Sequence, residues 1–237
     1  MCVIFFAHRV HPVHPLILIA NRDEFYDRPT AAASRWEDRP EIFAGRDLVH
    51  GGTWLGITDS GRFAAVTNYR QPSAPGGKRS RGALVSGFLG SSRSPADFLD
   101  EIRECSEYFS GFNLIAGDRD TVAYFSNREG VVRTLEPGIY GLSNHLLDTP
   151  WPKVRGGKER FAAAITPANI NPDNLFAILG DKSLAPDDEL PDTGVGYERE
   201  KLLSAIFIET PVYGTRSSSI VLADNDFGLS LEERTFV

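Results

Sequence analysis

The residue with the clearest chemical potential is Cys2, at the start of the chain. Removal of Met1 would leave Cys2 with a thiol and a free α-amine on the same carbon atom. Such a residue combines a nucleophile with its own candidate base. The alternative is that Cys2 is a small buried apolar side chain, which is a common role for free cysteine. Taken alone, this residue leaves both interpretations open.

A second group of chemically capable side chains consists of Asn21, Arg22, Asp23 and Glu24, directly after the apolar run 16–20. Alternate residues of a strand face opposite sides, so Arg22 and Glu24 would share one face, with Asn21 and Asp23 on the other. An arginine beside a thiol favours the thiolate, and an aspartate can orient an amine. The alternative is a solvated turn whose internal ion pair contributes little to stability.

The surrounding sequence predicts the elements that would position these groups. Residues 2–7 and 16–20 are continuous apolar segments around a His/Pro-rich turn, which is typical of a hairpin of two buried strands. The polar group 21–24 would then lie at a strand end. Further strands are predicted at 41–44, 53–58, 62–68, 112–116, 121–126, 131–135, 138–142, 217–223 and 227–234, and helices at 80–90, from 94, and at 152–165, 171–180 and 197–207.

This order of elements predicts the fold class. Runs of strands alternate with runs of helices, which favours an α+β layered domain with mainly antiparallel sheets over a doubly wound fold. No internal repeat and no shift in composition marks a domain boundary. We therefore predict a single domain over residues 1–237.

Composition narrows the function classes. The formal net charge of -7 and the pI near 5.3 argue against a nucleic-acid surface, which needs clustered Lys and Arg. Cys2 and Cys105 lie far apart and form neither a metal-binding pair nor a disulfide framework, so a reducing compartment fits best. No signal peptide and no run of eighteen apolar residues is evident. We expect a cytoplasmic protein without stable membrane insertion.

The histidines at positions 8, 11 and 14 form a spaced triplet that invites a metal or haem interpretation. However, His11 and His14 each precede a proline, which favours an extended loop over the single helical face that such ligands would need. We interpret the triplet as a turn between strands. The sequence accordingly predicts neither a metal site nor a cofactor.

The Met1-Cys2 start and the polar group 21–24 belong to a longer series of sequence blocks that occur in a fixed order. This series resembles the NRDE family, also called the transport and Golgi organisation protein 2 family. The resemblance implies an N-terminal nucleophile hydrolase, whose fold is a four-layer αββα sandwich. The blocks are Asn21–Phe25, Gly51–Gly56, Thr67–Arg70, Ser80–Gly82, Gly111–Leu114 and Gly141–Asn144.

More remotely, the chain is similar to cysteine-type members of that superfamily such as penicillin V acylases and bile salt hydrolases. By this resemblance Cys2 matches the nucleophile, and Arg22 and Asp23 match an early Arg/Asp pair. In the acylases two residues separate that pair, whereas here they adjoin, so either Asp23 or Glu24 would hold the acidic role.

Three later residues complete the site that this resemblance implies. Asn68 and Asn144 match the two asparagines, the first of which lends its amide to an oxyanion hole, and Arg216 matches a late arginine. A single Asn or Arg at a strand end is otherwise a common turn or surface residue. The residues predicted to contact substrate are Asn21, Glu24, Trp54, Tyr69 and Arg70, with core packing as the alternative for Trp54.

Two functions of different class follow. The first is an N-terminal cysteine hydrolase that cleaves an amide or thioester of a small or lipid-like acyl compound. The second is a non-enzymatic protein that uses the same pocket to bind and carry haem or an acyl lipid. The first requires loss of Met1, because an attached methionine converts the α-amine of Cys2 into an amide that cannot act as a base.

Overall fold

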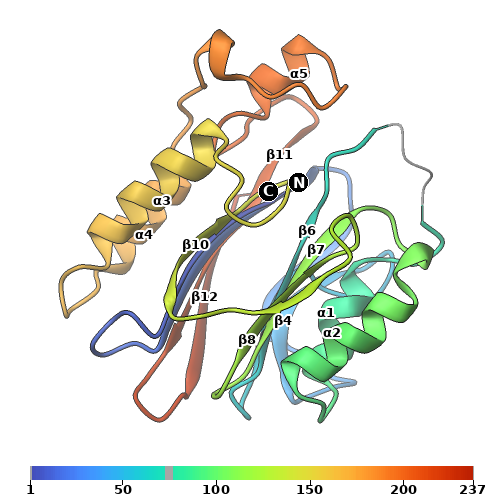
Figure 1. The fold of residues 1–237 in the computed structure, drawn as a ribbon, viewed down its shortest axis with the longest axis vertical. Helices are drawn as coiled ribbons and strands as arrows, with labels where there is room; N and C mark the ends of the chain where they lie inside the picture. The colour runs from blue at the N-terminus through green and yellow to red at the C-terminus, as the bar shows by residue number, and fades with distance from the viewer. Residues whose placement is uncertain (1, 73–76, 237) are drawn as a thin grey trace.

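Two antiparallel sheets lie face to face at the centre of the molecule (Figure 1). The structure is a computed structural model that describes residues 2–72 and 77–236. The first sheet has the strand order β10 (Gly138–Leu142), β1 (Cys2–His8), β2 (Leu16–Phe25), β11 (Tyr213–Ala223) and β12 (Leu229–Thr235). The second has the order β3 (Thr30–Arg35), β4 (Ile42–Asp47), β5 (Leu55–Thr58), β6 (Phe63–Asn68), β7 (Phe112–Gly117), β8 (Val122–Ser126) and β9 (Val132–Thr134).

Helices cover the outer faces of both sheets. The pair α3 (Pro152–Ala164) and α4 (Pro172–Leu179) packs on the five-stranded sheet, and α1 (Gly82–Leu89) and α2 (Pro95–Glu104) pack on the seven-stranded sheet (Figure 1). The predicted four-layer αββα sandwich is therefore confirmed. A fifth helix, α5 (Tyr197–Leu202), lies beyond one end of the layers, and short 3₁₀ turns occupy Ser106–Tyr108 and Asp187–Glu189.

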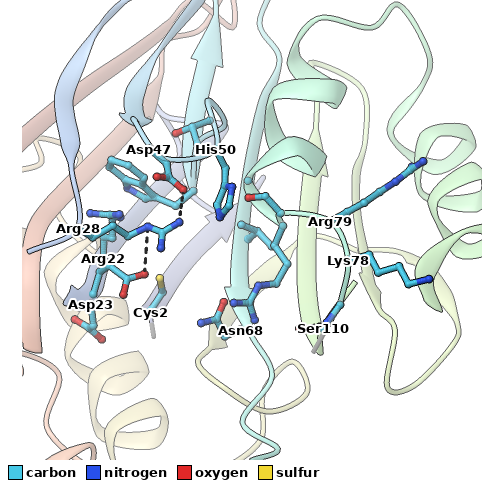
Figure 2. A pocket seen from close by; sticks show the side chains of 18 residues that line it. Cys2, Arg22, Asp23, Arg28, Asp47, His50, Asn68, Lys78, Arg79 and Ser110 are labelled. Carbon is cyan, nitrogen blue, oxygen red and sulfur yellow. Dashed lines mark hydrogen bonds and ion pairs between the residues drawn. The ribbon is translucent and has the colours of Figure 1, made fainter. Parts of the chain in front are cut away.

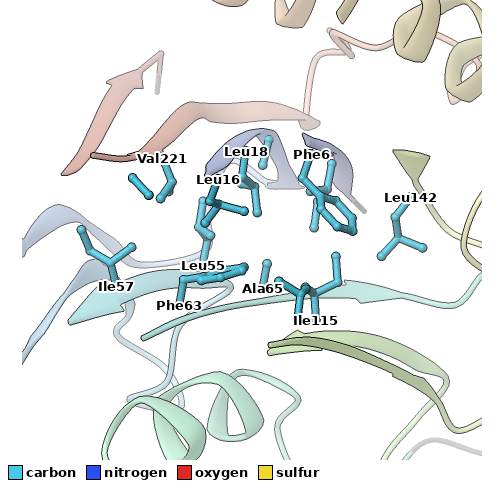
Figure 3. Packing of buried hydrophobic residues seen from close by; sticks show 14 of the residues in the cluster. Phe6, Leu16, Leu18, Leu55, Ile57, Phe63, Ala65, Ile115, Leu142 and Val221 are labelled. Atoms are coloured by element: carbon cyan, nitrogen blue, oxygen red, sulfur yellow. The ribbon is translucent and has the colours of Figure 1, made fainter. Parts of the chain in front are cut away.

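The strand β1 shows how the sequence specifies these layers. Ile4 and Phe6 pack into the core between the two sheets (Figure 3), while Val3 and Phe5 pack against the helices on the outer face. A strand that is buried on both faces has no polar side to alternate with, so it reads as a continuous apolar run. The same argument holds for Leu16–Ile19 on β2, whose alternate residues divide between the same two cores.

Several predicted boundaries were wrong, and two of these errors concern the site. β2 does not end at Ala20 but continues to Phe25, and β11 begins at Tyr213 instead of Ser217. The two strands pair along this added length, so backbone hydrogen bonding continues where the side chains turn polar. The register shifts between Thr215 and Ser217, which makes a β-bulge at Arg216. The strand β3 was not predicted.

The histidine triplet forms the turn that the sequence predicts. The ring Nδ1 of His11 accepts hydrogen bonds from the backbone N–H groups of Val13 and His14, and it thereby closes the connection between β1 and β2. The rings of His11 and His14 stack with centroids 5.3 Å apart. Within residues 2–72 and 77–236, no group of three His, Cys, Asp or Glu side chains is placed to hold a metal ion. In the same residues, every helix is too short or too polar to cross a membrane.

Candidate functional site

The pairing of β1 with β2 places Cys2 directly opposite Arg22. Both residues line a cavity of about 340 Å³ between the ends of the two sheets, shown in Figure 2. Asp23 and Glu24 of β2 also line it, and Asn68 at the end of β6 lines it from the second sheet. One cavity therefore brings Cys2 together with Asn68, which lies 66 positions later in the sequence.

Arg22 is held rigidly beside the thiol. Its guanidinium carbon lies 4.1 Å from the centre of the Trp54 ring, an arrangement that combines stacking with cation–π attraction. Trp54 also lines the cavity, and it packs against the central core, so it takes both of the positions considered for it. Burial lowers the pKa of Arg22, while the neighbouring Cys2 and Glu24 oppose that effect.

The surroundings of Cys2 have opposing effects on the pKa of its thiol. Burial raises the pKa of Cys2, and the Asp23 charge adds to the rise, whereas a hydrogen bond from the Asp23 backbone and the charge of Arg22 lower it. A thiol with a raised pKa is protonated at neutral pH and needs a base before it can attack. The site therefore suits a mechanism in which a base removes the thiol proton during the reaction.

Asp23 is buried and tied to β11. The Thr215 hydroxyl donates a 2.7 Å hydrogen bond to Oδ1 of Asp23, and the Tyr213 hydroxyl donates to its backbone carbonyl at 3.1 Å. Burial raises the pKa of Asp23, and the charge of Lys153 and the Thr215 hydrogen bond lower it. The extra residue in the bulge at Arg216 separates Thr215 from Ser217, which faces Arg22. The bulge thus allows one strand to support both Arg22 and Asp23.

Asn68 is positioned by its backbone. The side-chain amide of Asn144 donates a 3.0 Å hydrogen bond to the carbonyl of Asn68, and the Asn144 carbonyl accepts one of 2.7 Å from the backbone N–H of Arg70. No hydrogen bond uses the side-chain amide of Asn68 among the residues that the structure describes. That amide is available to a ligand in the cavity.

A cation from α1 completes the wall opposite β2. Arg81 is the N-cap of α1 and lines the cavity, and its Nη1 donates to the Gly111 carbonyl at 3.2 Å. The loop at Gly52 packs directly on Gly82, since a Cβ on Gly52 would lie 2.5 Å from the Gly82 carbonyl carbon. Two glycines therefore let this loop approach closely enough to fix Arg81.

Asn21 and Asn144 were predicted at the site, but neither lines the cavity. The Asn21 amide donates to the carbonyls of Leu179 and Ile206, and Ser218 donates to its oxygen at 2.6 Å. It anchors β2 to the helical layer and has no donor left for substrate. The Asn144 amide is occupied by the Asn68 carbonyl, so Asn144 positions Asn68 and does not itself reach the cavity.

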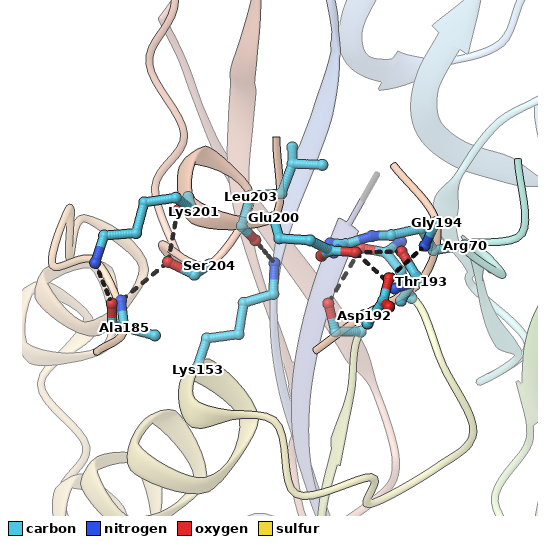
Figure 4. A network of polar contacts seen from close by, with 12 residues as sticks. Arg70, Lys153, Ala185, Asp192, Thr193, Gly194, Glu200, Lys201, Leu203 and Ser204 are labelled. Atoms are coloured by element: carbon cyan, nitrogen blue, oxygen red, sulfur yellow. Dashed lines mark hydrogen bonds and ion pairs between the residues drawn. The ribbon is translucent and has the colours of Figure 1, made fainter. Parts of the chain in front are cut away.

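Tyr69 and Arg70 also lie outside the cavity. The Tyr69 hydroxyl is 2.7 Å from Nε2 of His145, with which it forms a hydrogen bond. Arg70 is buried in an ion pair with Glu200 and stacks over Trp151 at 4.8 Å (Figure 4). Both residues follow the end of β6 at Asn68, and these contacts hold their side chains outside the cavity.

Arg216 does not reach the main cavity either. Its Nη1 donates to the carbonyls of Phe25 at 3.0 Å and of Arg28 at 2.7 Å, and so it supports the turn that follows β2. It lines a separate enclosed space of about 30 Å³ behind Arg22. Arg216, the late arginine predicted from the family resemblance, therefore stabilises the polar end of β2 by contacts outside the main cavity.

Several residues that line the cavity carried no predicted role. Arg28 and Asp47 form a 2.7 Å ion pair at its edge, and His50 and Thr53 lie beside them. Arg81 belongs to a sequence block that carried the family resemblance, and this block was its only signal. These residues come from loops and strand ends, whose positions are set by long-range packing and not by local sequence periodicity.

The whole chain, residues 1–237, matches the model of a protein family described as Transport and Golgi organisation 2. A relative named Transport and Golgi organization protein 2 homolog, from Bos taurus, is 40% identical over 260 residues. That alignment covers 100% of this chain and 94% of the relative. The predicted family resemblance is therefore confirmed.

Two solved structures share the architecture. An N-acylethanolamine-hydrolyzing acid amidase ortholog from Caenorhabditis elegans superposes with a TM-score of 0.54 at 10% identity, over 100% of both chains. The C2A mutant of a conjugated bile acid hydrolase from Clostridium perfringens superposes with a TM-score of 0.51 at 9% identity, over 100% of this chain and 97% of the other. At such identities the likeness establishes the fold, which is that of the N-terminal nucleophile hydrolases.

Proposed function

This chain belongs to the Transport and Golgi organisation 2 family, and from the geometry of its cavity we propose that it is an N-terminal cysteine hydrolase of an acyl amide or thioester. The observation that carries the proposal is the convergence of Cys2, Arg22, Asp23 and Asn68 on one cavity. Met1 lies outside the residues that the structure describes. The proposal requires its removal, so that Cys2 carries a free α-amine.

The reaction begins with proton transfer within one residue. The α-amine of Cys2, with an ordinary pKa of about 7.7 to 8.0, accepts the thiol proton near neutral pH. The thiolate then attacks the acyl carbonyl carbon, and the C=O electron pair moves to oxygen. The tetrahedral intermediate collapses, the leaving amine or thiol takes the proton from the ammonium, and a thioester to Cys2 remains.

Water completes the cycle. The α-amine accepts a proton from a water molecule as that water attacks the thioester carbonyl, and collapse of the second tetrahedral intermediate releases the carboxylic acid. The departing sulfur of Cys2 recovers its proton from the ammonium. Both halves of the reaction therefore use the same base, and no further reactant is needed.

The other cavity residues have distinct roles in this proposal. The free side-chain amide of Asn68 donates to the developing oxyanion, a contribution that typically amounts to a factor of about 10²–10³ in rate. Arg22 stabilises the thiolate after proton transfer, because opposite charges at close range favour the ionised form. Asp23, held by Thr215, orients the α-amine toward the thiol.

The structural neighbours support an amide-cleaving chemistry. One is named for hydrolysis of N-acylethanolamines, and the other is a conjugated bile acid hydrolase in which the cysteine at position 2 was replaced by alanine. Neither name supplies the substrate of this chain. They support hydrolysis of an acyl compound as the reaction class.

The first experiment measures the intact mass of the purified protein and its turnover of acyl p-nitroanilides and acyl thioesters of N-acetylcysteamine, with chains of different length. We expect a mass that corresponds to a chain beginning at Cys2, hydrolysis of at least one compound, and no hydrolysis by Cys2→Ala. Cys105→Ala is the matched control and should retain activity, because Cys105 is the C-cap of helix α2 and does not line the cavity.

Two results would refute the proposal. Retention of Met1 in most molecules would leave Cys2 without its base, and hydrolysis by Cys2→Ala at the wild-type rate would remove the nucleophile from the mechanism. The carrier alternative gives a different pattern, in which Cys2→Ser binds acyl lipid or haem as the wild type does and neither protein turns over substrate.

A further inference from the structure

The cavity that contains Cys2 has a charge composition opposite to that of the chain. The whole sequence has a formal net charge of -7, yet five cationic and three acidic side chains line this cavity. The cationic side chains are those of Arg22, Arg28, Lys78, Arg79 and Arg81. A local excess of positive charge in an acidic protein attracts anions to that place.

Ion pairs are distributed unevenly among these charged side chains. Arg28 lies 2.7 Å from Asp47 and 4.0 Å from Glu24, so a single arginine contacts two of the three acidic residues. The third, Asp23, is held by Thr215 on β11. Figure 2 shows the ends of Lys78 and Arg79 directed away from Cys2. Without these two, three cationic and three acidic side chains remain, but Arg22 and Arg81 form no ion pair with a carboxylate among the residues that the structure describes.

Arg22 is the most informative of these residues. Its side chain is 6% exposed, and its Nη1 has no hydrogen-bond partner within the described parts of the chain. The Trp54 ring covers one face of the guanidinium but cannot accept hydrogen bonds as an anion does. A buried cation with unused donors costs free energy, and this cost is recovered when an anion binds.

Arg81 faces the same space from the second sheet layer. Its one hydrogen bond, from Nη1 to the Gly111 carbonyl, leaves its other donors unused, and no carboxylate within the described residues pairs with it. Burial lowers the pKa of both Arg22 and Arg81, and the charge of Cys2 opposes this effect on both, so both guanidinium groups lie within electrostatic reach of the sulfur. Helix α1 adds the partial positive charge of its N-terminus, and its first turn contains no acidic residue.

We propose that the acyl compound cleaved at Cys2 carries a carboxylate close to the scissile bond, and that Arg22 and Arg81 bind it. This inference rests on the proposed hydrolase function and adds the substrate class. A carboxylate matches the guanidinium in shape, since two parallel N–H donors face two oxygens. The cavity of about 340 Å³ accommodates a small anionic group together with the reacting carbonyl.

The test compares two alkylating reagents of nearly equal size, neutral iodoacetamide and anionic iodoacetate, at Cys2. Both react with the same thiolate, so their rate ratio cancels any change in the pKa of Cys2. We expect the ratio of the iodoacetate rate to the iodoacetamide rate to be on the order of tenfold higher at Cys2 than at the thiol of N-acetylcysteinamide in free solution. This rate ratio should fall as salt is added. Mass spectrometry of the N-terminal peptide measures both rates.

Variants of Arg81 locate the effect. Arg81→Gln should lower the ratio several-fold, whereas Arg81→Lys, which keeps the charge, should retain most of it. Arg93→Gln, at an exposed arginine that pairs with Glu101 outside the cavity, is the matched control and should leave the ratio unchanged. Urea unfolding of each variant shows whether the fold is kept.

Each other outcome overturns the inference. A ratio equal to that of the free thiol, or one that Arg81→Gln does not alter, would show that the cavity does not select anions at Cys2. A further outcome is that inorganic phosphate slows the reaction of Cys2 with iodoacetamide, whereas acetate at equal ionic strength does not. In that case the anionic group that the cavity binds is not a carboxylate. Cys2-dependent cleavage of neutral acyl compounds in the first assay would still support the hydrolase, so the two proposals fail separately.

Discussion

Replacement of Glu200 by Gln tests whether Arg70 supports the fold instead of contacting substrate. The side chains of Arg70 and Glu200 are 5% and 4% exposed, and they form an ion pair between the segment after β6 and helix α5 (Figure 4). Glu200 also accepts a 2.9 Å hydrogen bond from the backbone N–H of Thr193. The change to Gln keeps the shape and one acceptor oxygen but removes the negative charge.

The structure sets the size of the expected effect. Breaking a buried ion pair by neutralising one partner typically costs about 3–5 kcal/mol, because the remaining charge stays buried without compensation. Nε and Nη2 of Arg70 already lack hydrogen-bond partners in the described residues, so they offer no alternative contact for the charge. We therefore expect Glu200→Gln to lower the free energy of unfolding by about 3 kcal/mol or more. The double variant Arg70→Met/Glu200→Leu should recover most of this loss.

Urea unfolding followed by tryptophan fluorescence measures this effect, since Trp151 stacks on Arg70. With a slope of about 1–3 kcal/mol per molar urea, the midpoint should fall by roughly 1 M or more. Asp59→Asn is the matched control, because its pair with Arg35 is 53% and 72% exposed and should contribute only about 0–1 kcal/mol. A loss for Glu200→Gln no larger than that of the control would refute the reasoning.

Three further predictions concern buried polar groups. Asn144→Ala leaves the Asn68 carbonyl without its donor, so the free energy of unfolding should fall by about 1–3 kcal/mol. Any Cys2-dependent turnover should also drop. Unchanged values of both would contradict this positioning role. Burial lowers the pKa of Lys153 to about 8, so between pH 8 and 10.5 the unfolded chain binds more protons and wild-type stability rises with pH. In urea titrations, the stability of Lys153→Met relative to wild type should therefore fall by about 3 kcal/mol across that window. Burial lowers the pKa of His8 to about 4, so wild-type stability should fall as the pH drops from 6.5 to 4, by up to about 3 kcal/mol, and His8→Gln should lack this component in the same titrations.

The layers of the fold could be predicted because apolar patterning is a local property of the sequence. Continuous apolar runs marked the strands that are buried on both faces, such as residues 2–7, and Ser94-Pro95 marked the start of a helix, where the Ser94 hydroxyl accepts from the Asp97 backbone. The polar end of β2 could not be recognised in this way. Its backbone pairing with β11 depends on residues about 190 positions away, and its side chains interrupt the apolar pattern.

The site could be predicted in part, for a related reason. Cys2 and Arg22 face each other because the hairpin between them fixes their register, and a hairpin is a local feature. The side-chain contacts of Asn21, Asn144 and Arg70 depend on packing with distant elements, so their residue types alone did not distinguish a ligand contact from a structural one. The family resemblance supplied candidate site residues at these positions, but their hydrogen bonds and ion pair show that they stabilise the fold around the site.

The partners of buried polar side chains separate structural residues from candidate functional residues in this protein. Asn21 has its amide fully engaged, and Arg70 has a carboxylate partner, so both are explained by the folded chain itself. Arg22 lines the same cavity as Cys2, and among the described residues it forms no ion pair with a carboxylate and its Nη1 has no hydrogen-bond partner. A fold retains such unsatisfied groups at a net cost in stability, and function is the usual reason. Arg22→Met should therefore raise the free energy of unfolding or leave it unchanged, and it should abolish the preference of Cys2 for iodoacetate. A loss of several kcal/mol in the free energy of unfolding would instead make Arg22 a structural residue.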